Sequence, residues 1–249
     1  MADVLGTRAI FGVIGPSTNT IVQPEFEAMK PWGVTNHYSR IATANAKAVS
    51  NDTFLAGTKK IAENIDDAVA RVLTCEPSCM VMGMSAITFF GGAKGAEDFR
   101  SHVEAISGLK VSTGSLACLA ALKAYGCGKN ISVISPYFPA MNDQVRTFFE
   151  DYGYKVVRDR ALECPSWTDI ARVPEVTLRD VIRDELDGDD VDAIIQVGTN
   201  LRMANFAQIA ENWLGKPVIA INTATYWHAL RLSGIDDEVH GFGRLLSDL

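Results

Sequence analysis

The chain has 249 residues, 47% of them hydrophobic, and a formal net charge of -7. That hydrophobic content is enough for the core of one large domain, or of two lobes of roughly 100–125 residues each. The negative charge gives no general attraction to nucleic acid or to an anionic membrane. No apolar run approaches the ~20 residues that span a bilayer. The N-terminus lacks the basic start and long apolar core of a signal peptide, so we expect a cytoplasmic protein.

The chain contains five cysteines, an odd number that favours free thiols in a reducing compartment. Cys75 and Cys79 are separated by three residues, and no cluster of histidines accompanies them. We therefore expect no metal site. Cys118 lies on an apolar helix face, which predicts a core position. The sequence leaves the oligomeric state open, with a homo-oligomer among the options.

Short apolar runs alternate with segments of helical periodicity along the whole chain. In the first half, we predict strands over residues 8–14, 34–41, 79–82 and 109–111, and helices over residues 24–29, 53–73, 96–106 and 114–125. In the second half, we predict strands over residues 130–135, 155–158, 193–197 and 217–221, and helices over residues 141–152, 174–186, 205–214 and 223–232. This alternation is typical of the α/β class with parallel sheets.

One local plan recurs four times: an apolar strand, a polar turn with small residues, and the start of a helix. The turns are residues 15–20, 83–85, 136–137 and 198–200. Because ligands of parallel sheets sit at the carboxyl ends of the strands, we expect one cleft between two similar Rossmann-like lobes related by pseudo-two-fold symmetry. We place residues 1–115 plus 223–249 in the N-terminal lobe, and residues 116–222 in the C-terminal lobe.

These turns carry backbone N–H groups and hydroxyl or amide side chains, which together form an anion site at a helix N-terminus. We expect a small carboxylic acid to be held between the two lobes. The candidate donors are Ser17, Thr18, Asn19, Met84, Ser85, Thr199 and Asn200. Ordinary helix capping is the alternative for each of them. The phenol of Tyr137 is a further candidate donor, and Trp167 is a candidate for the pocket wall.

Several stretches resemble the aspartate/glutamate racemase superfamily, in its maleate cis-trans isomerase and arylmalonate decarboxylase branch. They are Pro16-Ser17-Thr18-Asn19-Thr20, Met82-Gly83-Met84-Ser85 with Phe89-Phe90, Ser135-Pro136-Tyr137, Ala171-Arg172-Val173, Leu214-Gly215-Lys216-Pro217 and Gly241-Phe242-Gly243-Arg244-Leu245. The resemblance covers the whole chain. It implies two lobes, a cleft between them, no cofactor and a small carboxylic or dicarboxylic acid as substrate.

One departure from this resemblance is that both family cysteines are missing. The racemases and isomerases have one cysteine at the end of each facing strand, and the decarboxylase keeps only the second. Counting back from Leu214 places the second position at Gly198, and the first falls on Gly83. We interpret both glycines as room for ligand, with close packing of the strand ends as the alternative. A cysteine restored at position 198 is then expected to place a thiol beside the ligand. Cys164, in a loop that lines the pocket in relatives, is a candidate proton donor or simply a packed residue.

We assign Tyr137, Ser85, Gly83 and Gly198 to the catalytic part of the predicted site. The remaining candidates, Trp167 and Cys164 among them, are assigned to substrate binding. Isomerisation through a cysteine–carbon bond needs a thiol, whereas decarboxylation through an enediolate needs an anion cradle, an apolar pocket and a proton source. The sequence therefore favours a decarboxylase-like lyase. An isomerase, a racemase, a hydratase and a carboxylate-binding protein without turnover are the alternatives.

Overall fold

The computed structural model describes residues 3–47 and 49–249. Within them the chain forms two four-stranded parallel sheets, with strand orders β2-β1-β3-β4 and β6-β5-β7-β8. The strands are β1 (Ala9–Pro16), β2 (Val34–Ile41), β3 (Cys79–Met82), β4 (Val111–Ser112), β5 (Asn130–Ser135), β6 (Lys155–Ala161), β7 (Ala193–Gln196) and β8 (Val218–Ala220). Two parallel sheets with the same strand order confirm the predicted class and the two similar lobes. The exact division at residues 115 and 222 stays a prediction.

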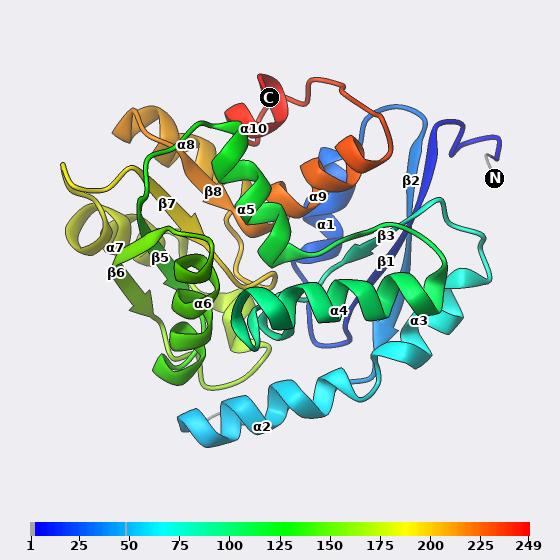
Figure 1. Ribbon diagram of the computed structural model, residues 1–249, viewed down its shortest axis with the longest axis horizontal. Helices are drawn as coiled ribbons and strands as arrows, with labels where there is room; N and C mark the ends of the chain where they lie inside the picture. Colours follow the sequence, from blue (N-terminus) through cyan, green and yellow to red (C-terminus); the bar gives the residue numbers. More distant parts are fainter. Residues whose placement is uncertain (1–2, 48) are drawn as a thin grey trace.

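The α-helices lie between the strands along the chain, with both α2 and α3 between β2 and β3 and α10 at the end (Figure 1). They are α1 (Val22–Met29), α2 (Asn51–Ala62), α3 (Ile65–Leu73), α4 (Gly92–Ser107), α5 (Gly114–Ala124), α6 (Pro139–Asp151), α7 (Glu175–Val181), α8 (Ala204–Leu214), α9 (Ile221–Leu232) and α10 (Arg244–Ser247). Single turns add η1 (Ala86–Phe89), η2 (Asp169–Arg172) and the π-type η3 (Ile182–Leu186). None of the described helices is long and apolar enough to cross a membrane.

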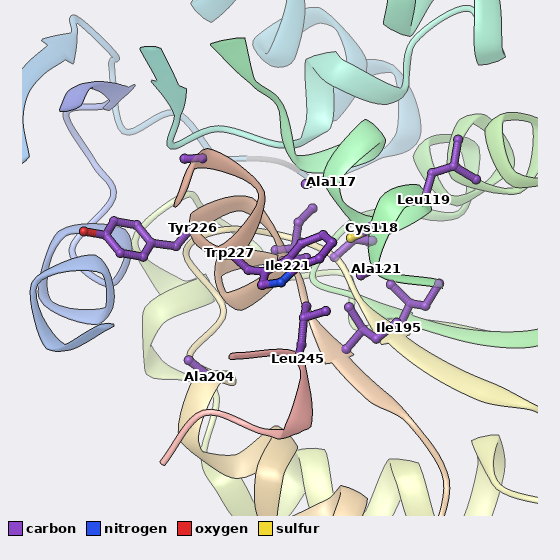
Figure 2. Close-up of a cluster of buried hydrophobic side chains, with 14 of the residues drawn as sticks. Ala117, Cys118, Leu119, Ala121, Ile195, Ala204, Ile221, Tyr226, Trp227 and Leu245 are labelled. Atoms are coloured by element: carbon purple, nitrogen blue, oxygen red, sulfur yellow. The ribbon is translucent and has the colours of Figure 1, made fainter. Parts of the chain in front are cut away.

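Helices α5 and α9 join the two sheets (Figure 1). Each of them directly follows the last strand of its sheet, because α5 begins after β4 and α9 after β8. Figure 2 shows the apolar cluster at their contact, where Ala117, Cys118 and Ala121 of α5 face Ile221 and Trp227 of α9. Cys118 is fully buried there, which confirms its predicted core position.

The strand ends that carry the candidate residues come together because the sheets are parallel. In the first sheet, Ile14 of β1 pairs with Met82 of β3. In the second sheet, Ile134 of β5 pairs with Gln196 of β7. Each pair is followed at once by a polar turn, so two turns from each sheet lie at one carboxyl edge.

The structure corrects the single helix predicted over residues 53–73, which is broken between α2 and α3. Helix α2 buries Phe54 against Trp167, with ring centroids 4.9 Å apart. Helix α3 instead contacts β1 and β2 and buries Val69. One straight helix cannot follow both surfaces, and the break near Asn64 redirects the chain.

The side chain of His228 on α9 faces the end of β4. Its Nδ1 lies 3.0 Å from the hydroxyl of Ser112 at the end of β4. Burial, followed by the nearby Arg100 guanidinium, lowers the pKa of His228 to about 4.

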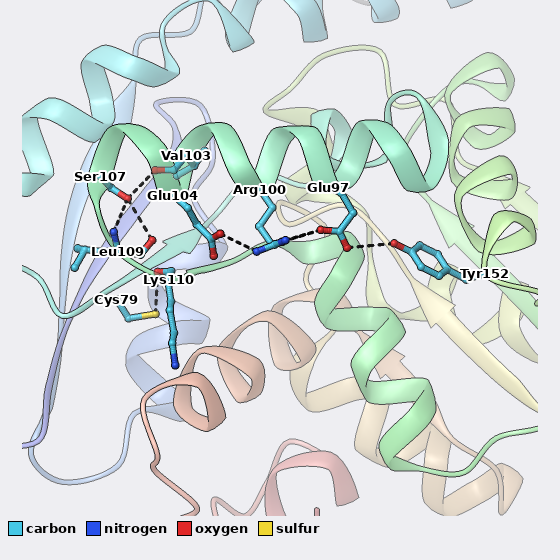
Figure 3. A network of polar contacts seen from close by, with 9 residues as sticks. All are labelled: Cys79, Glu97, Arg100, Val103, Glu104, Ser107, Leu109, Lys110 and Tyr152. Carbon is cyan, nitrogen blue, oxygen red and sulfur yellow. Dashed lines mark hydrogen bonds and ion pairs between the residues drawn. The ribbon is translucent and has the colours of Figure 1, made fainter.

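Figure 3 shows Arg100 between Glu97 and Glu104 on α4, with Tyr152 beyond Glu97. This network ties α4 to the C-terminal end of α6.

Candidate active site

A cavity of about 50 Å³ lies where the two sheets face each other. It has room for roughly three to five water-sized groups, at 10–15 Å³ each. The lining residues are Pro16, Thr18, Asn19, Ile61, Met84, Ser85, Ala86, Pro136, Tyr137, Trp167, Ile170, Gly198, Thr199 and Asn200. All of these described lining residues are uncharged. Any anion bound here would be held by neutral donors.

The hydroxyl groups of Ser85 and Tyr137 form a hydrogen bond of 2.8 Å across the cavity wall. Ser85 Oγ also accepts the backbone N–H of Thr199 at 3.2 Å. Burial raises the pKa of Tyr137, so the phenol stays protonated over the whole neutral range. With Ser85 donating to Tyr137, the phenol O–H remains available to a ligand.

Thr199 was expected to offer its N–H and hydroxyl to a ligand. In the structure both groups are hydrogen-bonded to other protein atoms. The N–H is bonded to Ser85, and the hydroxyl donates to the carbonyl oxygen of Gly83 at 3.0 Å. The same hydroxyl accepts from Asn19 Nδ2 at 3.0 Å. Thr199 therefore acts as a clamp between the two strand ends.

The amide side chains of Asn19 and Asn200 are likewise used by the protein. Asn19 Oδ1 accepts the N–H groups of Ile21 and Val22 at 3.0 and 2.9 Å, which is the capping alternative. Asn200 Oδ1 accepts the N–H of Thr20 at 2.9 Å, and its Nδ2 donates to the Trp167 carbonyl at 2.8 Å. These two residues line the cavity as cross-links of the surrounding turns.

Backbone N–H groups of the lining residues remain available to a ligand, although several of the side-chain donors are bonded to protein. Within the described part of the chain, several lining residues have backbone N–H groups with no protein acceptor, among them Thr18, Met84, Ser85, Gly198 and Asn200. Buried N–H groups without a partner are rare in folded proteins, because leaving them unpaired costs free energy. They come from both sheets, so the cavity offers donors from two sides.

Three predicted residues lie outside the lining. Ser17 is exposed, and its hydroxyl accepts the Thr43 N–H at 3.0 Å. Gly83 is packed, since an added Cβ would meet the Ile14 carbonyl oxygen at 3.1 Å. Cys164 is buried behind the wall, its N–H bonded to the Pro136 carbonyl at 3.1 Å, and burial raises its pKa to about 11.

Gly198 lines the cavity with its backbone, and the structure corrects its interpretation as room for ligand. Its φ is +104°, a conformation that favours glycine, and an added Cβ would lie 2.4 Å from Pro136 Cδ. A side chain at this position would collide with Pro136. The thiol expected from a restored cysteine therefore has no space in this backbone conformation.

The apolar half of the wall was largely missed from the sequence. Trp167 was a candidate, and it packs against Phe54 and over Gly57, whose added Cβ would lie 2.8 Å from the Trp167 ring. Ile61 and Ile170 were not candidates. They come from α2 and η2, and no local pattern distinguishes them from other buried isoleucines.

Comparison with known proteins agrees with this arrangement. A family model described as arylmalonate decarboxylase matches residues 11–246. The chain belongs to the arylmalonate decarboxylase family. This bears out the resemblance that the turn motifs suggested.

Curated relatives of this chain are isomerases and a decarboxylase, which supports the expectation that the protein is an enzyme. A maleate isomerase of Pseudomonas putida is 27% identical over 248 residues, covering 95% of this chain and 96% of the relative. An arylmalonate decarboxylase of Bordetella bronchiseptica is 24% identical over 194 residues, covering 77% and 80%.

Several solved structures share the fold of this chain. A mutant of the Nocardia farcinica maleate cis-trans isomerase with a covalently bound succinylcysteine intermediate has a TM-score of 0.85 at 22% identity. The alignment covers 96% of this chain and 98% of that chain. A structure of arylmalonate decarboxylase has a TM-score of 0.75 at 20% identity, covering 95% and 98%.

Proposed function

We propose that the protein is a cofactor-independent lyase that decarboxylates a small malonate-like acid through an enediolate. The observation that carries this proposal is the cavity with unpaired backbone N–H groups from both sheets and the Tyr137 hydroxyl in its wall. Membership of a family that contains a decarboxylase and isomerases of a small dicarboxylic acid supports the same class of substrate.

The backbone donors suit the negative charge that develops during such a reaction. When the bond between the α-carbon and the departing carboxylate breaks, its electron pair moves into the remaining carboxylate and forms an enediolate. Fixed N–H groups at Met84, Ser85 and Asn200 would stabilise that charge without reorganising. The apolar wall around Ile61 and Ile170 would disfavour the charged leaving carboxylate over neutral CO₂.

The α-carbon must then receive a proton, and we assign this step to Tyr137. The Thr199 N–H and the Ser85 hydroxyl orient the phenol oxygen so that its own hydrogen can point into the cavity. The carbon of an enediolate is far more basic than a phenolate, so transfer is favourable although burial raises the pKa of Tyr137. Solvent reprotonates the phenolate after product leaves.

Isomerisation through a cysteine adduct ranks lower because no cysteine is among the described lining residues. The Nocardia farcinica isomerase carries its intermediate on a cysteine. Here the sulfur atoms of Cys118 and Cys164 are packed in apolar clusters. A second candidate function is carboxylate binding without turnover, which the same lack of a nearby thiol favours.

The test is incubation of the protein in D₂O with α-substituted malonates, maleate and hydroxy-dicarboxylates, followed by proton NMR. A monocarboxylic acid carrying one deuterium at its α-carbon is the expected product. Fumarate from maleate would instead support an isomerase. Binding of these acids in calorimetry without any product would support the binding protein, and neither binding nor product would reject the proposed site.

A further inference from the structure

Glu25 of α1 is a buried carboxylate that the reaction outlined above does not use. The residue is 7% exposed. Oε1 accepts the backbone N–H groups of Met203 and Ala204 at 3.2 and 3.1 Å, at the start of α8. Oε2 accepts Asn222 Nδ2 of α9 at 2.6 Å. One side chain of the first sheet's helical layer therefore holds two helices that adjoin the second sheet.

The surroundings of Glu25 are arranged for a carboxylate. Three donors converge on its two oxygens, and the N-terminal end of α8 carries a partial positive charge. A buried carboxylate without such partners would be strongly destabilising. The number of partners shows a built arrangement rather than a chance contact.

Asn222 connects Glu25 to the cavity lining. Its Nδ2 also donates to the backbone carbonyl of Thr199 at 2.9 Å. Both neighbours of this nitrogen are acceptors, so the amide must present its two hydrogens to them. Asn222 Oδ1 has no hydrogen-bond partner among the described residues, in keeping with a side chain oriented by its donors.

We propose that Glu25 is a positioning residue that acts through Asn222 to fix the turn of residues 198–200. The Thr199 carbonyl is held from one side by Asn222, and the Thr199 N–H is directed from the other side onto Ser85 Oγ. Among the described residues, Glu25 makes no hydrogen bond to the cavity lining and reaches Thr199 only through Asn222. Its catalytic consequence rests on the proposed function, whereas its effect on the turn does not.

Glu25→Gln is the sharpest variant because it keeps the shape of the side chain. If the new amide oxygen faces the N–H groups of α8, the new NH₂ group faces Asn222 Nδ2, donor against donor. The chain of contacts to Thr199 is then broken. Asn222→Ala removes the same contact to Thr199 but keeps the hydrogen bonds from the start of α8 to Glu25. This variant therefore serves as the test if Glu25→Gln fails to fold.

Glu211→Gln is the matched control. Glu211 is also a buried glutamate, 4% exposed, and its Oε2 accepts the N–H of Arg244 at 3.0 Å at the start of α10. It therefore caps a helix as Glu25 does, but none of its hydrogen bonds within the described chain reaches a lining residue of the cavity. Loss of stability alone should affect both variants in the same way.

The experiment measures hydrogen exchange of single amides by NMR in the ¹⁵N-labelled protein. We expect the Thr199 amide to exchange at least about tenfold faster in Glu25→Gln and in Asn222→Ala, and to be unchanged in Glu211→Gln. If Glu25→Gln accelerates exchange only at Met203 and Ala204, Glu25 is a simple helix cap and the proposal is overturned. An unchanged Thr199 amide in Asn222→Ala would also overturn it.

Kinetics add a second readout, using whichever malonate the parent protein decarboxylates. The two variants should lose about tenfold in kcat with KM within about threefold, because the turn orients Ser85 and Tyr137 and its Asn200 N–H acts on charge that develops only in the transition state. An equal loss in Glu211→Gln would contradict this. If the parent turns over none of the acids, the proposed function fails, and the exchange experiment still decides the role of Glu25.

Discussion

Ser85 Oγ and Tyr137 Oη lie 2.8 Å apart, although the two residues follow strands of different sheets. Since Ser85 Oγ also accepts the Thr199 N–H, a single hydroxyl joins the turns after β3, β5 and β7. This one oxygen atom therefore contributes to the position of three turns around the cavity. That contribution can be measured directly.

Ser85→Ala should reduce kcat about tenfold, because the phenol of Tyr137 loses its orienting partner. It should also lower the free energy of unfolding by about 1 kcal/mol through the lost hydrogen bonds. Ser132→Ala is the control, since the Ser132 hydroxyl is buried and donates to the Leu186 carbonyl at 2.8 Å, away from the cavity. Steady-state kinetics and denaturant unfolding on both variants check this, and equal losses of kcat would contradict it.

Gly198→Ala should destabilise the protein by roughly 1–3 kcal/mol, through its φ of +104° and the collision with Pro136. Gly215→Ala separates the two causes, because Gly215 also has a positive φ while an added Cβ meets no atom within 4 Å. It should cost only about 1 kcal/mol. Urea unfolding measures both. A Gly198→Ala variant as stable as Gly215→Ala would show that the turn adapts to a side chain.

Much of the sheet arrangement could be predicted because short apolar runs between glycine, proline and polar turns mark buried strands. The strands at residues 34–41, 79–82 and 130–135 have the predicted bounds. The turns of the site were found by the same signal, since a parallel sheet brings its carboxyl ends together. The division into lobes at residues 115 and 222, the cytoplasmic location and the oligomeric state stay predictions.

What the sequence could not supply is the partner of each polar group. Thr199 and Asn19 carry the residue types of ligand donors, yet they bond to each other across 180 positions of the chain. The break between α2 and α3 has the same origin, because it depends on contacts with Trp167 and the first sheet. Local pattern predicts most of the polar residues that reach the cleft, and the packing between the sheets decides which of their groups remain free.

Protein stability should fall in acid because of His228. The unfolded chain takes up a proton near pH 6.5, whereas burial lowers the pKa of His228 in the folded protein to about 4. The contribution of His228 is therefore complete above pH 6.5 and is lost as the pH falls toward about 4. Asparagine can replace the Nδ1 contact to Ser112, so His228→Asn should show a shallower fall in this window. Denaturant unfolding at several pH values tests this, and parallel curves for both proteins would refute it.

Cys164 should not take part in turnover, since burial raises its pKa to about 11 and its sulfur is packed outside the lining. Cys164→Ala should keep kcat within about twofold, with a modest loss of stability from the small cavity. In the parent, the half-buried Cys75 should react with a thiol reagent before Cys164 does. Loss of turnover in Cys164→Ala would show that the proton donor lies in the loop around residue 164, and it would contradict the assignment of Tyr137.

The most direct test of the proposed reaction is the decarboxylation rate of Tyr137→Phe beside that of Tyr226→Phe. Both tyrosines are buried and each makes a single side-chain hydrogen bond, Tyr137 to Ser85 at 2.8 Å and Tyr226 to Asn36 at 3.1 Å. Both variants should lose about 1 kcal/mol of stability. Tyr137→Phe should lose about a hundredfold or more in kcat as well, while Tyr226→Phe stays within about twofold of the parent. A Tyr137→Phe variant that decarboxylates as fast as Tyr226→Phe would show that the proton comes from another group.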